Sequence, residues 1–205
     1  MTVFYILRHG ESEWNADEDR YCGKSDIILS AEGKRQAEQA AKYLQSIPFA
    51  AIYSSPQQRA LETVRPIAER QGLPVIIDER LREIDFGRWE GLNRKEIQQN
   101  FPDSWKKWNE NPGEFSAGET GENADEVYER ANNFYMEKMR EHEGDTVLVL
   151  GHNTLNRLFI AGSLSIPFHK YRSLAQSNTG VSIVELTPGY LKWLQLNGTE
   201  HLTSL

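Results

Sequence analysis

The sequence predicts an α/β fold in which helices cover both faces of a mostly parallel sheet, a three-layer α/β/α sandwich. Three observations predict it. Short apolar runs rich in β-branched and aromatic residues alternate with stretches of helical spacing. The run TVLVL at 146–150 is almost continuously apolar, as expected of a strand buried on both faces. No repeat, low-complexity tract or interdomain linker interrupts the 205 residues, so we expect a single domain over 1–205.

The first half of the chain supplies three predicted strands and two predicted helices. In order they are strand 3–7, helix 31–47, strand 49–54, helix 56–72 and strand 74–78. Ser30 is the predicted N-cap of the first helix. For the second helix we expect Ser55 as the N-cap, Pro56 at the first helical position and Gly72 at the end. Pro66 lies inside this helix and is expected to kink it.

The middle of the chain, 79–122, is polar, rich in tryptophan and without long regular elements. Its segments 94–101 and 103–110 are typical of short helices, and 111–122 is typical of a loop. Because this stretch interrupts the βα alternation, we expect it to form an inserted lid over one end of the sheet. Its tryptophans could contact a ligand, although packing is the commoner role of such residues.

The alternation returns in the last third of the chain. A long helix is predicted at 123–143, a strand at 146–150 and another helix within 151–164. Strands at 181–186 and 190–196 are predicted to close the fold as a hairpin. We expect the 181–186 strand to expose an edge that could pair two copies of the chain as a homodimer.

Composition narrows the class of partner. The net charge of −7 argues against nucleic acid and against an anionic membrane surface as partners. Cys22 is the only cysteine, so an internal disulfide and a cysteine-based metal site are both excluded. The apolar run at 3–7 is too short to span a bilayer or to serve as a secretion signal. We expect a cytoplasmic protein that binds a small molecule.

Charged and imidazole side chains follow the predicted strands at the points where the strands end. They are Arg8 and His9 after the first strand, Arg59 after the second, Glu83 after the third, and His152 with Asn153 after the fourth. Ligands of such sheets bind beyond the carboxyl ends of the strands. The helices after the second and fourth strands would also point their N-terminal N–H groups at this region.

This convergence predicts an anion site. Each residue alone has a commoner structural role, such as a surface salt bridge or a satisfied core histidine. Together, arginines and histidines at one edge would repel each other unless an anion joined them. A phosphate is the simplest choice, because two guanidiniums and two helix N-termini match its oxygens and its charge.

The sequence lacks the motifs that other classes of phosphate-binding and phosphate-transferring enzymes require. The segment CGKS at 22–25 lacks the upstream glycine of a nucleotide-binding loop, and no G-x-G-x-x-G follows a strand. The strand ends offer arginine and histidine rather than the clustered aspartates of a two-metal phosphatase. No arginine-closed loop follows Cys22. A histidine nucleophile that needs no metal remains.

Four motifs in this order resemble the histidine phosphatase superfamily, in the branch of the cofactor-dependent phosphoglycerate mutases and related phosphatases. They are LRHGESEWN, SSPQQRALET, LREIDFGRWEG and GHN. The resemblance implies the phosphoglycerate mutase-like fold and a phosphohistidine formed on His9. It further implies that Glu83 protonates the leaving oxygen and later activates water, without a cofactor or metal. The residues implied to bind the phosphoryl group are Arg8, Asn15, Arg59, His152 and Asn153.

The resemblance leaves phosphatase and mutase open. REIDFGRWEG and the helix start GENADEVYER resemble the phosphatases, including α-ribazole phosphatases and broad-specificity members, and the arginine pair of the mutases is missing. The stretch around Tyr21 is similar to the mutases, so Cys22 and Gly23 are expected to contact the substrate. The favoured function is hydrolysis of a small phosphomonoester, such as α-ribazole phosphate or a sugar or glycerate phosphate. The alternative hypothesis is a cofactor-dependent phosphoglycerate mutase, and a third, less favoured hypothesis is a non-catalytic phosphate-binding module.

Overall fold

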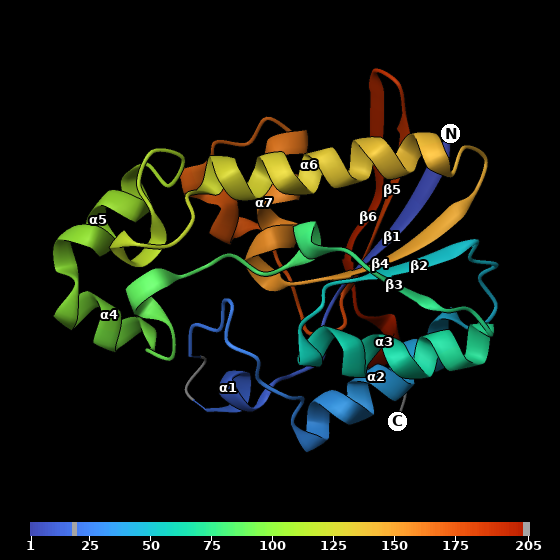
Figure 1. Ribbon diagram of the computed structural model, residues 1–205, viewed down its shortest axis with the longest axis horizontal. Helices are drawn as coiled ribbons and strands as arrows, with labels where there is room; N and C mark the ends of the chain where they lie inside the picture. Colours follow the sequence, from blue (N-terminus) through green and yellow to red (C-terminus); the bar gives the residue numbers. More distant parts are fainter. Residues whose placement is uncertain (18–19, 203–205) are drawn as a thin grey trace.

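The computed structural model describes residues 1–17 and 20–202, which form a mixed six-stranded sheet flanked by helices (Figure 1). The strands are β1 (Thr2–Arg8), β2 (Ala51–Ser54), β3 (Val75–Ile77), β4 (Thr146–Gly151), β5 (Val181–Thr187) and β6 (Tyr190–Gly198). The α-helices are α1 (Glu13–Ala16), α2 (Ala31–Leu44), α3 (Gln58–Gln71), α4 (Arg94–Asn100), α5 (Pro102–Glu110), α6 (Ala124–Glu141) and α7 (Asn153–Ser163). Within these described parts, no helix is long and apolar enough to cross a membrane.

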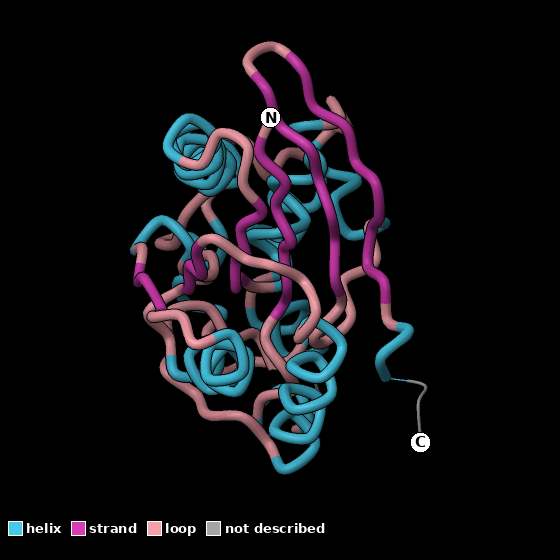
Figure 2. Tube along the Cα trace, turned by 90° about the vertical axis from the view of Figure 1, so that its right-hand side faces the viewer, coloured by secondary structure: helices cyan, strands magenta, loops and turns pink. Residues whose placement is uncertain are grey.

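The sheet has the order β3-β2-β4-β1-β5-β6 and is mostly parallel. The pairs β3–β2, β2–β4 and β4–β1 are parallel, whereas β5 runs antiparallel to β1 and pairs with β6 as a hairpin. Helices α2 and α3 cover one face and α6 and α7 cover the other (Figure 1). The hairpin projects beyond its neighbours (Figure 2). The predicted three-layer α/β/α sandwich is confirmed.

The core follows the alternation of side chains along the central strands. In β4, Val147 and Val149 pack in the cluster under α6 and α7, whereas Leu148 and Leu150 pack in the cluster under α2 and α3. All four are fully buried, which explains why both the odd and the even positions of this strand are apolar. Burial of each such side chain stabilises the fold by about 1.5–3 kcal/mol.

Strand register brings the ends of three strands together. Leu7 of β1 and Ser54 of β2 both pair with Leu150 of β4, and the next pair along is Arg8 with Gly151. The residues that follow these strands therefore emerge side by side at the carboxyl edge of the sheet.

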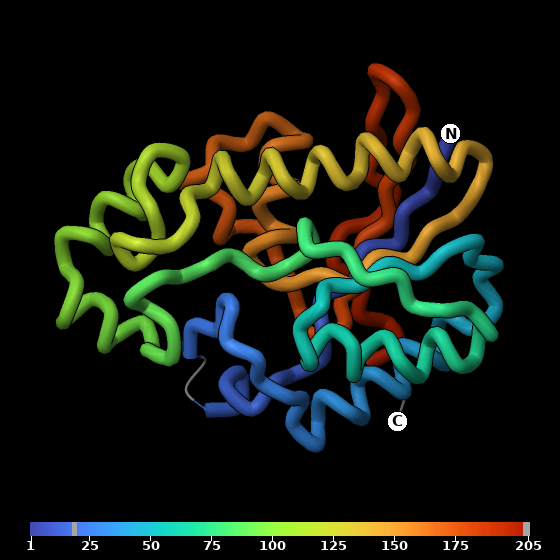
Figure 3. Tube along the Cα trace, viewed as in Figure 1, coloured from blue at the N-terminus to red at the C-terminus, as the bar shows by residue number. Residues whose placement is uncertain are grey.

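The predicted lid lies at one end of the molecule. After β3 the chain runs along the sheet and out to α4 and α5, at the left of Figure 3, before returning to α6. Trp89 and Trp108 from this segment are fully buried in the cluster under α6 and α7, so they have the packing role. None of the lid tryptophans is among the described residues that line the cavity considered below.

Two local predictions were wrong, and one short helix was not predicted. Helix α3 begins at Gln58 with Gln57 as its N-cap, so Ser55 and Pro56 precede the helix. Strand β5 lies between β1 and β6, so the 181–186 segment is no free edge and β6 holds that position. The short helix α1 was not predicted, although its capping box from Ser12 to Asn15 is visible in the sequence.

Candidate active site

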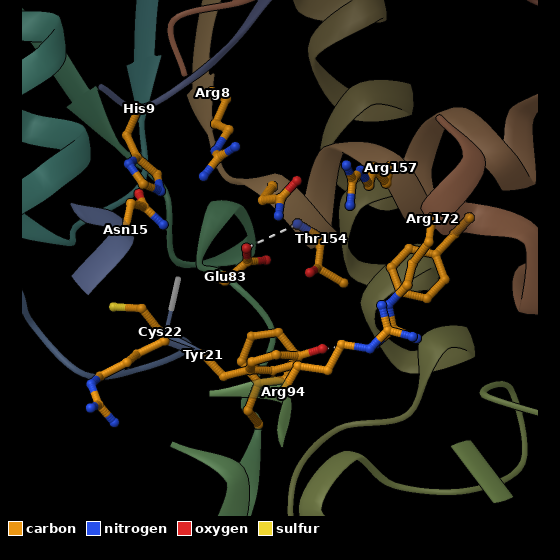
Figure 4. A pocket seen from close by; sticks show the side chains of 14 residues that line it. Arg8, His9, Asn15, Tyr21, Cys22, Glu83, Arg94, Thr154, Arg157 and Arg172 are labelled. Carbon is orange, nitrogen blue, oxygen red and sulfur yellow. Dashed lines mark hydrogen bonds between the residues drawn. The ribbon is translucent and has the colours of Figure 1, made fainter. Parts of the chain in front are cut away.

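A cavity of about 360 Å³ opens at the carboxyl edge of the sheet, and the lid segment contributes Glu83 and Arg94 to its lining (Figure 4). Its walls come from the end of β1, from α1, the 20–22 segment, the lid segment after β3, the start of α7 and the 3₁₀ helix Phe168–Ser173. Of the predicted site residues, the cavity is lined by Arg8, His9, Asn15, Cys22, Glu83 and Asn153. Arg59, Gly23 and His152 are not among its described lining residues, although the ring centroid of His152 lies 5.1 Å from that of His9.

His9 follows β1 and is 4% exposed. Its Nδ1 lies 2.6 Å from the carbonyl oxygen of Gly10. A carbonyl only accepts, so Nδ1 carries the proton and Nε2 holds the lone pair. Burial holds the pKa of His9 well below its usual value, and the charges of Arg59 and Arg8 lower this pKa further. The ring is therefore neutral at pH 7, as a nitrogen nucleophile requires.

His152 is fully buried directly after β4, with its ring centroid 5.1 Å from that of His9. Its Nε2 lies 2.8 Å from the hydroxyl oxygen of Ser55. Burial, then the charge of Arg59, holds the pKa of His152 well below its usual value. Its Nδ1 is buried and has no hydrogen-bond partner among the described residues. The hydroxyl thus fixes one ring nitrogen and leaves the other for a ligand.

The two predicted arginines differ in their surroundings. Arg8 lines the cavity and donates through Nη1 to the carbonyl oxygen of Gln176 at 2.7 Å. Arg59 is fully buried and donates to the carbonyl oxygens of Ser25 and Gly23, both at 2.8 Å. Arg59 thus holds the 22–25 segment in place, and its charge acts on both histidines.

Glu83 is fixed by backbone N–H groups at the start of α7. Its Oε2 accepts from Thr154 at 2.9 Å (the dashed line of Figure 4), and its Oε1 accepts from Leu155 at 2.9 Å and Ile84 at 3.0 Å. The side-chain oxygen of Gln57 also accepts from the backbone N–H of Glu83 at 3.0 Å. The carboxyl group is therefore held in one orientation at the cavity wall.

Two asparagines lie at starts of helices. Asn15 closes the capping box of α1, where its Oδ1 accepts from the backbone N–H of Ser12 at 3.2 Å. Asn153 is the first residue of α7, and its buried Oδ1 has no hydrogen-bond partner within the described ranges. Both side chains reach the cavity, as Figure 4 shows for Asn15.

The 22–23 segment contributes one lining side chain and one structural glycine. Burial raises the pKa of Cys22 to about 11, so the thiol stays protonated at neutral pH. The carbonyl oxygen of Gly23 accepts from Gln57 at 2.6 Å as well as from Arg59. A Cβ on Gly23 would lie 2.2 Å from the carbonyl oxygen of Ile84, so only glycine fits here.

The sequence analysis did not predict many of the residues that line the cavity. The additional lining residues are Arg20, Tyr21, Phe86, Arg94, Thr154, Arg157, Tyr171 and Arg172. Arg157 follows Thr154 by three residues on α7, which places both on the same face of that helix and was visible in the sequence. Arg172 belongs to a short 3₁₀ helix, Phe168–Ser173, which was not predicted, so nothing indicated its place here.

The described lining of the cavity suits an anion. Five arginines line it, and Glu83 is the one carboxylate among its described lining residues. Across the described part of the chain, no group of three histidine, cysteine or acidic side chains could hold a metal ion. A neutral imidazole, fixed positive charge and an oriented carboxyl group are the parts that phosphoryl transfer to a histidine requires.

Known proteins resemble this chain over almost its whole length. Phosphoserine phosphatase 1 of Hydrogenobacter thermophilus is 35% identical over 204 residues, covering 98% of this chain and 95% of that protein. The solved structure of Bacillus stearothermophilus YhfR is 32% identical, with a TM-score of 0.91, and covers 98% of this chain and all of that one. A phosphoserine phosphatase of Entamoeba histolytica, solved with 3-phosphoglyceric acid, is 30% identical with a TM-score of 0.87, covering 98% of this chain and 100% of that one.

A family model agrees with these relatives. The model of the histidine phosphatase superfamily (branch 1) matches residues 4–199, which include every residue of the candidate site. The chain belongs to the histidine phosphatase superfamily, branch 1.

Proposed function

We propose that the protein is a metal-independent phosphomonoesterase that works through a phosphohistidine on His9. One observation carries the proposal: Nδ1 of His9 donates to the carbonyl of Gly10, so Nε2 of a neutral, buried ring keeps its lone pair beside Arg8. The phosphatase relatives support hydrolysis as the outcome.

In the first step, Nε2 of His9 attacks phosphorus and the bond between phosphorus and the ester oxygen breaks. Arg8, Asn15, the N-terminus of α7 at Asn153 and the Nδ1–H of His152 bind the phosphoryl oxygens. Arg59 adds its positive charge beside both histidines while it donates to the carbonyl oxygens of the 22–25 segment. Fixed donors of this kind lower the barrier because they need no reorganisation.

The carboxyl group of Glu83 gives its proton to the leaving oxygen. In the second step a water molecule loses a proton to the Glu83 carboxylate and attacks the phosphohistidine. The phosphorus–nitrogen bond breaks, inorganic phosphate leaves, and both residues return to their starting states. Three backbone N–H groups hold this carboxyl group on one side of the cavity, which suits a single residue acting in both steps.

The substrate is proposed to be a small phosphorylated metabolite, since a cavity of about 360 Å³ lies at the small end of ligand sites. Phosphoserine and glycerate phosphates join α-ribazole phosphate and sugar phosphates as candidates, because relatives carry the first two in their names. The lone, protonated thiol of Cys22 is consistent with a reducing, cytoplasmic setting.

The direct test is turnover of p-nitrophenyl phosphate in the presence of a metal chelator. We expect full activity with the chelator and its loss in His9→Ala. Glycerate phosphates assayed with and without a bisphosphate primer separate a mutase from a hydrolase. Activity that needs a metal and ignores His9→Ala would contradict the proposal, and so would stoichiometric phosphate binding without turnover.

A further inference from the structure

The wall of the cavity opposite His9 carries more positive charge than a phosphoryl group requires. In Figure 4, Arg157 and Arg172 lie across the hollow from His9, with Glu83 and Thr154 between them. Arg94, the first residue of α4, also lines this side. A phosphoryl group on His9 would lie at the other end, so this side of the cavity faces a different part of the substrate.

Arg172 is held rigidly by neutral partners. Its Nη1 donates to the side-chain oxygen of Asn109 at 2.6 Å, and its Nη2 donates to the phenol oxygen of Tyr21 at 3.2 Å. Its guanidinium carbon lies 4.8 Å from the ring centroid of Trp105 and 4.9 Å from that of Tyr171. Stacking of this kind fixes the plane of the guanidinium and leaves its edge to donate hydrogen bonds.

No carboxylate within the described ranges neutralises Arg172 or Arg94. Both guanidiniums nevertheless lie over the same indole, Arg94 at 5.5 Å from the centroid of Trp105. Arg20, by comparison, pairs with Asp17 and Glu96 and belongs to the rim. Like charges gathered around one ring repel each other unless an anion lies between them.

We infer that Arg172, stacked on Trp105 and Tyr171 and flanked by Arg94 and Arg157, binds a second anionic group of the substrate. The inference rests on the proposed function and specifies the substrate class: a small phosphomonoester that carries a carboxylate or a second phosphate a few bonds from the ester oxygen. Either group presents paired oxygens that match the edge of a guanidinium. Arg172 acts here as a binding residue and takes no part in the chemistry at His9.

The test compares matched pairs of substrates. 3-Phosphoglycerate and glycerol 3-phosphate have similar size and differ in the carboxylate, whereas fructose 1,6-bisphosphate and fructose 1-phosphate differ in the second phosphate. We expect the wild-type enzyme to favour the more anionic member of at least one pair by about tenfold or more in kcat/KM, the effect of one charge-assisted hydrogen bond. The pair that shows the preference identifies the anion.

Arg172→Gln should remove that preference and leave turnover of glycerol 3-phosphate and p-nitrophenyl phosphate within about threefold of wild type, and Arg172→Lys should keep part of it. Arg88→Gln is the control, because Arg88 is an exposed lid arginine over Phe101 that pairs with Glu119 and does not line the cavity. It should change neither ratio.

Two results would overturn the inference while leaving the proposed function intact. One is hydrolysis of p-nitrophenyl phosphate without a preference in either pair. The other is an equal loss on both members of a pair in Arg172→Gln. If no ester is hydrolysed, the proposed function fails, and calorimetric binding of 3-phosphoglycerate against glycerol 3-phosphate still decides the inference by the same comparison.

Discussion

Ser55→Ala removes the one hydrogen bond that the described residues make to the His152 ring. The hydroxyl of Ser55 lies 2.8 Å from Nε2, and Nδ1 has no partner in the described part of the chain. Because its pKa is lowered, His152 is neutral and has one N–H and one lone pair. A phosphoryl group offers only acceptors, so the useful tautomer has the proton on Nδ1, with the Ser55 hydroxyl donating to Nε2. Alanine would leave both tautomers available.

The structure sets the size of the expected effects. Ser55 and His152 are both fully buried, so an unsatisfied ring nitrogen should lower the free energy of unfolding by about 1–3 kcal/mol. Each 1 kcal/mol lowers the melting temperature of a chain of this length by about 2–4 °C. Loss of an entire charge-stabilising donor costs about 10²–10³ in kcat, so loss of its support should cost about tenfold or more.

Ser54→Ala provides a matched control. Ser54 is equally buried and donates to the carbonyl oxygen of Ser55 at 2.9 Å, without a bond to either histidine. Urea unfolding and p-nitrophenyl phosphate turnover would be measured on both variants. We expect both to lose stability and only Ser55→Ala to lose turnover. Wild-type kcat in a folded Ser55→Ala protein, or an equal loss in Ser54→Ala, would refute the role given to Ser55.

Three further perturbations test other parts of the site. The folded pKa values of His9 and His152 lie well below the unfolded value of about 6.5. The free energy of unfolding should therefore be highest above that pH and should fall below it, by up to about 2.7 kcal/mol per pH unit for the two histidines together. Urea unfolding at pH 7.5 and 5.5 measures this difference, and equal free energies would contradict it. Gly23→Ala should lower both the melting temperature and kcat, because a Cβ 2.2 Å from the carbonyl oxygen of Ile84 would displace the segment that Arg59 holds. Unchanged values would show that this segment accommodates the methyl group, against the role given to Gly23. Glu83→Gln should reduce kcat by about 10²–10⁴-fold on glycerol 3-phosphate and by less on p-nitrophenyl phosphate, whose leaving group needs no proton; equal losses would count against a general acid.

Much of the fold could be predicted from the sequence because the local hydrophobic pattern of the strands and helices agrees with their burial in the tertiary structure. The two-sided burial of β4 matches its unbroken apolar run, and strand ends in a parallel sheet must meet at one edge. Ser55 is a position at which the local sequence pattern predicted the wrong role. Serine before proline is a strong N-cap signal, yet the helix starts later and the hydroxyl serves His152 instead. Tertiary packing outweighed a local preference worth about 1 kcal/mol.

The sequence predicted the site residues that directly follow strands, and it did not predict those whose position depends on the lid. Arg8 and His9 lie at the end of β1 and His152 directly follows β4, so topology alone brings them to one edge. Arg172, by contrast, is held at the cavity by Trp105 and Asn109 of α5 in the lid, together with Tyr21. Contacts between segments about 60 residues apart leave no pattern in a single sequence.

The phosphohistidine itself is the most direct measure of the mechanism. The protein would be mixed with a substrate labelled in its phosphoryl group, quenched in alkali and digested, and the labelled peptide identified by mass spectrometry. We expect label on His9, stable to alkali and released by acid, with none in His9→Ala. Turnover without any labelled protein, or a label that persists in His9→Ala, would contradict transfer of the phosphoryl group to this imidazole.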